Sequence, residues 1–441
     1  MNAQSQIAAS FAADERPKSA VSTGVGLAGC LGLLAWTAAS RAYGMVGPFA
    51  ALAALVACGV PMILWSLLVD KVHRHASTGI AWDRPARPLR DTLDGSIVKI
   101  AGLWATWAII AFAYCIGRWY WDGQYLFAMY VLGIGSIGLL VVSIPYIIWL
   151  DRRVEDVRDG AWHFGQLVAG RRHLADPAVL QDYARGWAIK GFFLAFMISA
   201  LPYNWEVVIA PSSRDITANP INFTIWLAHA SFMVDVSFAT VGYMLTLKPL
   251  DSHIRSANPF AVAWIAALLC YPPFSPMQGG GPLDYRSGTG EWTYWLDSWP
   301  LAMVAVGIAI AFLHCVYAWA TVAFGPRFSN LTHRGILTHG PYAWTKHPAY
   351  ISKNITWWLM TLPFLATTGD PADMIRNTAL LGIVSGVYYW RARTEERHLM
   401  ADPDYRRYAE WIERNGLIAR LRRAFRPAEP EGGPLSPRLP A

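Results

Sequence analysis

The sequence predicts an all-α, polytopic transmembrane helical bundle of about ten spans with both termini in the cytoplasm. Of its 441 residues, 54% are hydrophobic and only 15% are charged, whereas soluble domains carry about 25% charged residues. Long apolar runs alternate with short charged segments, as in proteins that cross a bilayer repeatedly. This composition argues against a disordered chain, a nucleic-acid-binding module and a soluble cytosolic globule.

Ten apolar runs of roughly 15 to 25 residues are candidate spans. They lie near residues 23–40, 46–69, 97–117, 125–149, 187–210, 223–246, 259–273, 301–324, 350–369 and 375–391. The seventh and tenth runs are short, so we expect these helices to be less tilted, partly buried or re-entrant. A polar start that contains Asp14 and Glu15 precedes the first run. A signal peptide would begin with basic residues, so we expect an uncleaved first span.

The distribution of basic residues predicts the orientation. Ten spans place both termini on one side of the membrane. If that side is the cytoplasm, the basic residues that face outward are Arg41, Arg118, Arg214, Arg286 and Arg376. These five leave 32 of the 37 Lys and Arg residues in inward-facing segments. Such an excess is the positive-inside pattern of membrane proteins, so it supports both the number of spans and their direction.

The chain divides into four regions. A polar N-terminal segment (1–22) precedes a transmembrane region of unassigned role (23–324). A C-terminal region (325–426) contains the last two spans as a helical hairpin. Residues 427–441 hold five prolines and few apolar side chains, which predicts a disordered tail. All five cysteines lie inside apolar runs, so the sequence indicates neither a disulfide framework nor a metal site.

Residues with possible chemical roles concentrate in the segment 335–411. They form three groups, which are Gly340-Pro341-Tyr342, Lys346-His347-Pro348 with Tyr350, and Glu395-Glu396. The first group is a turn, because Gly and Pro break a helix there. The second precedes the ninth span and the third follows the tenth. Since the ninth span leaves the cytoplasm and the tenth returns to it, the hairpin should unite both groups in one polar site at the cytoplasmic interface.

In this segment the chain resembles the isoprenylcysteine carboxyl methyltransferase and phospholipid methyltransferase group of integral membrane enzymes. That group has a Gly-Pro-Tyr turn, an Arg-His-Pro-x-Tyr segment, a helical hairpin, Glu-Glu-x-x-Leu and a Tyr-rich helix. The matching residues, in order, are Gly340, Pro341, Tyr342, His347, Pro348, Tyr350, Glu395, Glu396, Leu399, Tyr405 and Tyr408. The resemblance covers roughly residues 325–425. Two positions depart from the pattern, since Lys346 replaces the usual Arg and Ser352 stands where Gly is common.

The resemblance implies a pocket for S-adenosyl-L-methionine that opens to the cytoplasm. The implied cofactor-binding residues are Gly340, Pro341, Tyr342, His347, Pro348, Tyr350, Glu395 and Glu396. Either glutamate can accept hydrogen bonds from the cofactor's ammonium or ribose, and either tyrosine can face its sulfonium. Lys346 or His347 can pair with its carboxylate. Lys346 is also the candidate catalytic residue, since it replaces the arginine expected to contact the substrate.

Two ionisable residues, His229 and Asp235, lie within the sixth span, where such groups are costly and often functional. They are six residues apart, so at about 100° per residue they point in different directions around a helix. We interpret both as candidate substrate-binding groups. The alternative is that each only forms a hydrogen bond to a neighbouring helix and fixes its packing.

The resulting hypothesis is an S-adenosylmethionine-dependent methyltransferase. Its acceptor would be amphipathic and embedded in the lipid bilayer, such as a prenylated cysteine carboxylate or a lipid. One alternative is a membrane sterol reductase that binds NADPH, a group with a similar Arg-His-Pro-Asn-Tyr segment. Ala349 after the Pro, and the preceding Gly-Pro-Tyr turn, favour the methyltransferase. The other alternative is a transporter or scaffold that retains an inactive domain.

Overall fold

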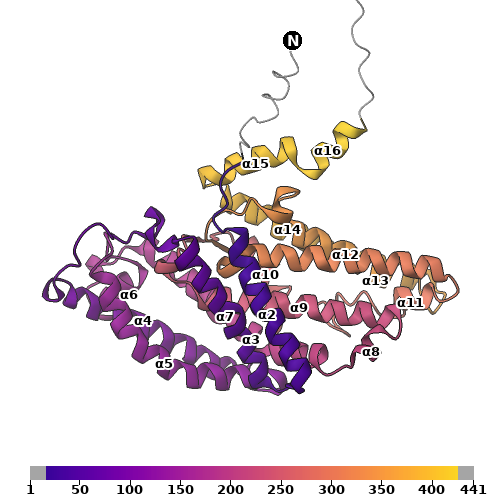
Figure 1. Ribbon diagram of the computed structural model, residues 1–441, viewed down its shortest axis with the longest axis horizontal. Helices are drawn as coiled ribbons and strands as arrows, with labels where there is room; N and C mark the ends of the chain where they lie inside the picture. Colours follow the sequence, from indigo (N-terminus) through magenta and orange to yellow (C-terminus); the bar gives the residue numbers. More distant parts are fainter. Residues whose placement is uncertain (1–15, 426–441) are drawn as a thin grey trace, which may run out of the picture.

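The computed structural model describes residues 16–425 and is almost entirely helical (Figure 1). Its α-helices are α2 (Thr23–Tyr43), α3 (Pro48–Leu64), α4 (Leu89–Gly117), α5 (Leu126–Asp151), α6 (Gly160–Val168), α7 (Pro177–Ile209), α8 (Ser213–Thr217), α9 (Pro220–Met244), α10 (Ala261–Leu268), α11 (Trp292–Trp295), α12 (Pro300–Phe324), α13 (Pro348–Thr361), α14 (Pro371–Leu399), α15 (Pro403–Asn415) and α16 (Leu417–Ala424). The predicted tail 427–441 lies outside the described residues, as do the first 15 residues of the predicted N-terminal segment.

Shorter elements connect these helices. A π-helical turn, η1 (Trp65–Val69), extends α3. The 3-10 turns are η2 (Val72–Arg74), η3 (Ala76–Thr78), η4 (Gly123–Tyr125), η5 (Arg172–Leu174), η6 (Lys248–Leu250), η7 (Gly325–Arg327) and η8 (Gly340–Ala343). Two strands, β1 (Ser256–Ala257) and β2 (Thr332–His333), pair antiparallel with Ser256 opposite His333. This small pairing ties the segment after α9 to the segment after α12.

Seven helices are long and apolar enough to cross a membrane: α2, α3 with η1, α4, α5, α7, α9 and α12 with η7. They coincide with the first six predicted spans and the eighth. In the other three places, α10 has eight residues and α13 has 14, while α14 has 29 residues but many charged side chains. The all-α membrane bundle is therefore confirmed, with seven candidate spanning helices among the described residues.

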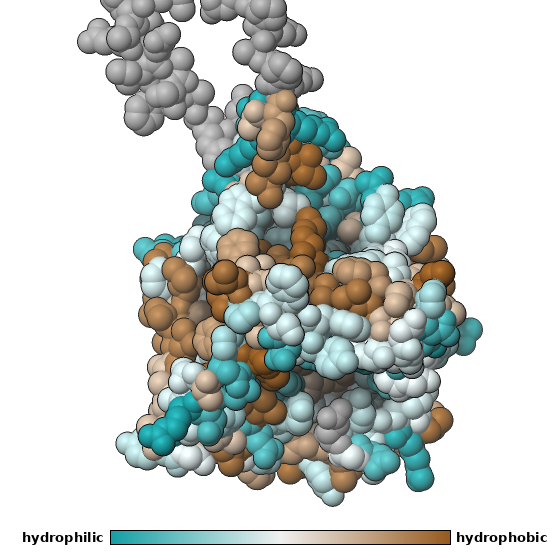
Figure 2. All heavy atoms as spheres, turned by 90° about the vertical axis from the view of Figure 1, so that its right-hand side faces the viewer, coloured by the Kyte–Doolittle hydropathy of each residue, from teal (hydrophilic) through white to brown (hydrophobic). Residues whose placement is uncertain are grey.

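The outer surface of the bundle is apolar. Side chains such as Leu31, Ile134 and Leu301 are 65%, 74% and 88% exposed, and Figure 2 shows large apolar patches on one face of the molecule. In water such patches would be unfavourable, whereas in a bilayer they face lipid chains. The helices therefore cannot rely on burial of apolar surface alone to associate, and they must also pack closely.

Glycines allow this close packing around α2. A Cβ atom added to Gly32 would lie 2.0 Å from the carbonyl oxygen of Ala57 on α3. A Cβ atom on Gly26 would lie 2.3 Å from the carbonyl oxygen of Val322 on α12. Because only a residue without a side chain permits such contact, α2 packs directly against the backbones of both helices.

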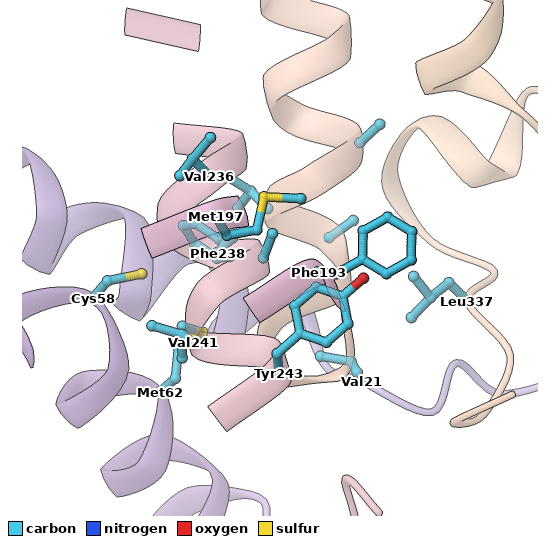
Figure 3. Packing of buried hydrophobic residues seen from close by; sticks show 14 of the residues in the cluster. Val21, Cys58, Met62, Phe193, Met197, Val236, Phe238, Val241, Tyr243 and Leu337 are labelled. Carbon is cyan, nitrogen blue, oxygen red and sulfur yellow. The ribbon is translucent and has the colours of Figure 1, made fainter. Parts of the chain in front are cut away.

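The hydrophobic core lies where α2, α3, α7, α9 and α12 meet (Figure 3). Phe193 of α7 stacks on Tyr243 of α9, with ring centroids 5.8 Å apart. The hydroxyl oxygen of Tyr243 accepts a hydrogen bond from the main-chain N–H of Asn330 at 2.9 Å. This bond connects the core to the segment that follows α12.

Two buried arginines organise the ends of α9 and α12. The Arg334 guanidinium, 2% exposed, donates hydrogen bonds of 2.7–2.9 Å to the main-chain carbonyl oxygens of Gly242, Ser252, Pro326 and Phe328. Arg327 forms a 2.9 Å ion pair with Asp251, which is also buried. Carbonyl groups at and beyond helix ends lack intrahelical partners, and Arg334 satisfies four of them. Together with the Arg327–Asp251 ion pair, it fixes the course of residues 245–252 and 325–334.

We expect Arg334→Lys to lower the melting temperature measured by thermal unfolding in detergent. Lysine keeps the charge but lacks the planar fork of N–H donors, and each buried carbonyl left without a partner costs roughly 1–3 kcal/mol. Arg84→Lys is the matched control, because the Arg84 side chain is 70% exposed. Equal melting temperatures for both variants and the parent would contradict the proposed role of Arg334.

Candidate functional site

A cavity lies between α9, α10, α12, α13, α14 and the segment 328–347. It encloses about 100 Å³, which is below the usual range of ligand sites, about 300–1,000 Å³. Tyr342, Lys346, His347, Tyr350 and Glu395 line it. The segment 335–411 therefore contributes much of its wall.

The Gly-Pro-Tyr turn forms η8 and sets the entrance to α13. Gly340 has φ +58°, and an added Cβ would lie 3.1 Å from Nε1 of Trp319, so this position favours glycine for two reasons. The Tyr408 hydroxyl donates a 2.7 Å hydrogen bond to the carbonyl oxygen of Tyr342, which fastens the turn to α15. Gly340 and Pro341 thus shape the backbone and do not line the cavity.

The hairpin brings the His-Pro and Glu-Glu segments together. His347 is the N-cap residue of α13 and Pro348 its first residue, a position that suits proline. His347 Nε2 lies 2.9 Å from Glu396 Oε1, and Lys346 Nζ lies 3.4 Å from Glu396 Oε2. The Tyr350 hydroxyl donates a hydrogen bond to Glu395 Oε2 at 3.1 Å. Two segments about 50 residues apart in sequence are therefore joined by side-chain contacts.

The two glutamates have different surroundings. Burial raises the pKa of Glu396, but the hydrogen bond from His347 and the charge of Lys346 outweigh burial and hold that pKa below its usual 4.5. Arg393 adds a 3.2 Å contact to the same carboxylate. Glu396 is thus fully engaged by protein groups and is absent from the cavity lining, whereas Glu395 lines the cavity.

Arg391 is a cavity residue that the sequence analysis missed. Its side chain is buried, and its guanidinium donates a 3.1 Å hydrogen bond to Asn330 Oδ1. The guanidinium carbon lies 5.1–5.8 Å from the ring centroids of Tyr350, Tyr388 and Tyr271. Within the part of the chain that the structure describes, no carboxylate forms an ion pair with it. The sequence could have indicated Arg391, because it lies four residues before Glu395 and therefore on the same face of a helix.

Asp235 lines this cavity, whereas His229 does not. Asp235 accepts a 2.7 Å hydrogen bond from the Thr321 hydroxyl and lies 3.9 Å from Lys353 Nζ. The sequence analysis also missed Lys353. The one sequence feature that could have indicated it is the presence of a lysine within an apolar run. His229 lines a second cavity, where its Nδ1 lies 3.2 Å from Asn204 Oδ1. The two candidates of the sixth span therefore belong to different sites.

The first cavity offers hydrogen-bonding groups of both charge signs among aromatic rings. Glu395 and Asp235 supply negative charge, while Arg391, Lys353 and Lys346 supply positive charge. Such a lining is complementary to a ligand that is both zwitterionic and aromatic. Within residues 16–425, no group of three His, Cys, Asp or Glu side chains is arranged to hold a metal ion.

Neither a family model, nor a curated protein, nor a solved structure matches this chain. The functional assignment therefore depends on the geometry and chemistry of the cavity and on its sequence motifs.

The lowered pKa of Glu396 predicts a pH-dependent contribution to stability. Because the folded-state pKa lies below the unfolded value of about 4.5, this contribution is present above pH 4.5 and is lost as the pH falls through the folded pKa. Glu396→Gln should therefore melt below the parent at neutral pH, and the difference should shrink in acid. Thermal unfolding between roughly pH 3 and pH 8 measures it.

Glu413→Gln is the control for this experiment, because Glu413 is an exposed carboxylate. It should follow the parent at every pH. A difference between Glu396→Gln and the parent that does not change with pH would contradict the assignment.

Proposed function

We propose that this protein is an S-adenosylmethionine-dependent integral membrane methyltransferase that acts on an amphipathic, membrane-embedded acceptor. One observation carries the proposal. Glu395 and the buried Arg391, which has no carboxylate partner among the described residues, lie one turn apart on α14. Both line the same cavity as Tyr342 and His347 of the Gly-Pro-Tyr and His-Pro motifs. The amino-acid end of the cofactor carries an ammonium and a carboxylate, to which this pair of side chains is complementary.

The other cavity residues also fit this cofactor. Arg391 would pair with its carboxylate, and Glu395 would accept hydrogen bonds from its ammonium. Tyr342 and Tyr350 offer aromatic faces for its sulfonium. When bound, the cofactor supplies an activated methyl group. The protein's part is to orient both reactants and to exclude water, and Glu396 supports this by fixing Lys346 and His347 at the cavity wall.

The acceptor would reach the cavity from the bilayer. Asp235 and Lys353 lie on α9 and α13, toward the membrane interior from the His-Pro motif, and Lys353 Nζ also lies 4.1 Å from the Tyr317 ring centroid. A polar pair at this depth is costly unless it serves a cavity or a ligand. It suits the head group of a prenylated cysteine carboxylate or of a lipid, whose apolar part would remain among the helices.

We further infer ten membrane crossings with both termini in the cytoplasm. Near the end of α12, the Phe324 ring contacts that of Tyr342, which precedes α13. Beyond the other end of α13, the Thr289 hydroxyl donates a 2.6 Å hydrogen bond to the carbonyl oxygen of Leu365, and Thr289 precedes α12. The segment 348–368 therefore runs back along the whole of α12, which supports a ninth crossing despite the short helix.

The helix α16 supports a cytoplasmic C-terminus. Ile418 and Leu421 are 63% and 48% exposed, and they alternate with Arg420, Arg422 and Arg423. In Figure 1 this helix lies at the edge of the molecule, outside the bundle. A short basic amphipathic helix is suited to the anionic inner surface of a membrane, in agreement with the excess of inward-facing basic residues.

NADPH-dependent reduction is the second candidate function, because the guanidinium of Arg391, which forms no ion pair with a carboxylate of the described residues, would also pair with a phosphate. Calorimetric titration of the purified protein in detergent with each cofactor separates the possibilities. Binding of S-adenosylmethionine alone supports the methyltransferase, and binding of NADPH alone supports the reductase. Binding of neither supports a transporter or scaffold.

In the same titration, Arg391→Gln and Glu395→Gln should each weaken S-adenosylmethionine binding. Loss of one charge-assisted hydrogen bond costs roughly 1.5–3 kcal/mol, which corresponds to roughly a tenfold to hundredfold rise in Kd. Arg84→Gln is the control, since the Arg84 side chain is 70% exposed and does not line the cavity. Parental affinity in both cavity variants would place the cofactor elsewhere.

Single cysteines on a cysteine-free background test the topology. Ser287 and Ser77 are both exposed serines, and the proposed topology puts them on opposite sides of the membrane. Ser287→Cys should react with an impermeant thiol reagent in intact cells. Ser77→Cys should react only after the membrane has been opened. Labelling of Ser77→Cys from outside would exclude this orientation.

A further inference from the structure

A second cavity of about 480 Å³ lies between α7, α9, the start of α5 and the segment 272–278. Tyr203, Asn204, His229 and Gln278 provide its polar lining. It lies beside the first cavity, because Phe196 of the second and Tyr271 of the first are in contact, with ring centroids 5.1 Å apart. All the residues that line it lie within the region 23–324, and the proposed methyl transfer uses none of them.

The polar lining of this cavity differs from that of the first. Among the described residues, no Asp, Glu, Lys or Arg side chain lines it. The imidazole of His229 uses Nδ1 for its contact with Asn204, and Nε2 has no hydrogen-bond partner in the described part of the chain. His229 is half-buried, and a polar atom without a partner is unfavourable within a bilayer. The cavity therefore offers a hydrogen bond to a ligand but no charge to neutralise one.

The cavity is accessible from lipid. Its walls are the candidate spanning helices α7 and α9. His229 is the tenth residue of α9, about 13 Å from its first residue at 1.5 Å per residue. Tyr203, at the rim, is 56% exposed on the outside of the bundle. An apolar molecule can thus enter laterally without crossing water.

We propose that the second cavity binds a neutral amphiphile with one hydroxyl head group and an apolar chain, such as an isoprenoid alcohol. Phospholipids and fatty acids carry charges for which the lining has no counter-charge, whereas a hydroxyl needs only the hydrogen bonds that His229 and Asn204 offer. The apolar chain would pack on Phe196 and Phe232. Binding here requires no cofactor, so this proposal and the proposed methyl transfer can fail separately.

Photolabelling in phosphatidylcholine nanodiscs tests the proposal. The probes are a long-chain alcohol and the fatty acid of equal length, each with the same diazirine group. The alcohol should label α7 and α9 within residues 196–232, and excess farnesol should prevent this labelling. The acid should label this segment no more than it labels the lipid-facing surface of α5. Labelled residues are mapped by mass spectrometry of peptides.

Variants test the role of the polar lining. His229→Leu should reduce labelling by the alcohol by about tenfold, as expected for loss of one hydrogen bond. His229→Gln keeps a hydrogen-bonding group and should retain most of it. Asn222→Leu is the control, because Asn222 is an exposed amide on the same helix. Equal labelling by both probes, labelling spread evenly over α4 and α5, or parental labelling of His229→Leu would each overturn the proposal.

Discussion

The buried arginine pair at the ends of α9 and α12 is the constraint on which the position of the candidate site depends. Arg334 satisfies four carbonyl groups from three segments, and Arg327 neutralises Asp251 beside it. Helix ends buried without such partners would be unfavourable. Because residues 325–334 are fixed in this way, the following segment starts from a defined position and carries Tyr342, Lys346 and His347 to the cavity.

The adjacent residues Glu395 and Glu396 of α14 have different contacts. Successive residues of a helix point about 100° apart, so Glu396 turns toward His347 and Lys346 while Glu395 remains in the cavity. One further turn back, Arg391 lies on the same face as Glu395. A helix that is fastened by one carboxylate thus presents a second carboxylate and a guanidinium to a ligand, and their geometry does not depend on flexible loops.

The two cavities differ in the charge of their lining residues. The first, beside the Gly-Pro-Tyr and His-Pro motifs, contains charges of both signs, and the second contains only neutral hydrogen-bonding groups. Phe196 and Tyr271 separate them, and Tyr271 also packs on Phe193 of the core. These aromatic rings thus lie between the charged lining of the first cavity and the neutral lining of the second.

The sequence by itself determined the membrane class, all seven candidate spanning helices and the meeting of the His-Pro and Glu-Glu segments. The seventh predicted span is the short helix α10, which has only eight residues. These features depend on local hydrophobicity and on the return of a helical hairpin, both of which the order of residues along the chain determines.

Only the tertiary structure decided which polar residues share a cavity. The sequence did not single out Arg391, because its contacts with Tyr271 and Asn330 come from residues more than 60 positions away. His229 and Asp235 looked equivalent, because one helix carries both, but different neighbouring helices face them. Burial and partners are properties of the packed bundle, so residues distant in sequence determine them.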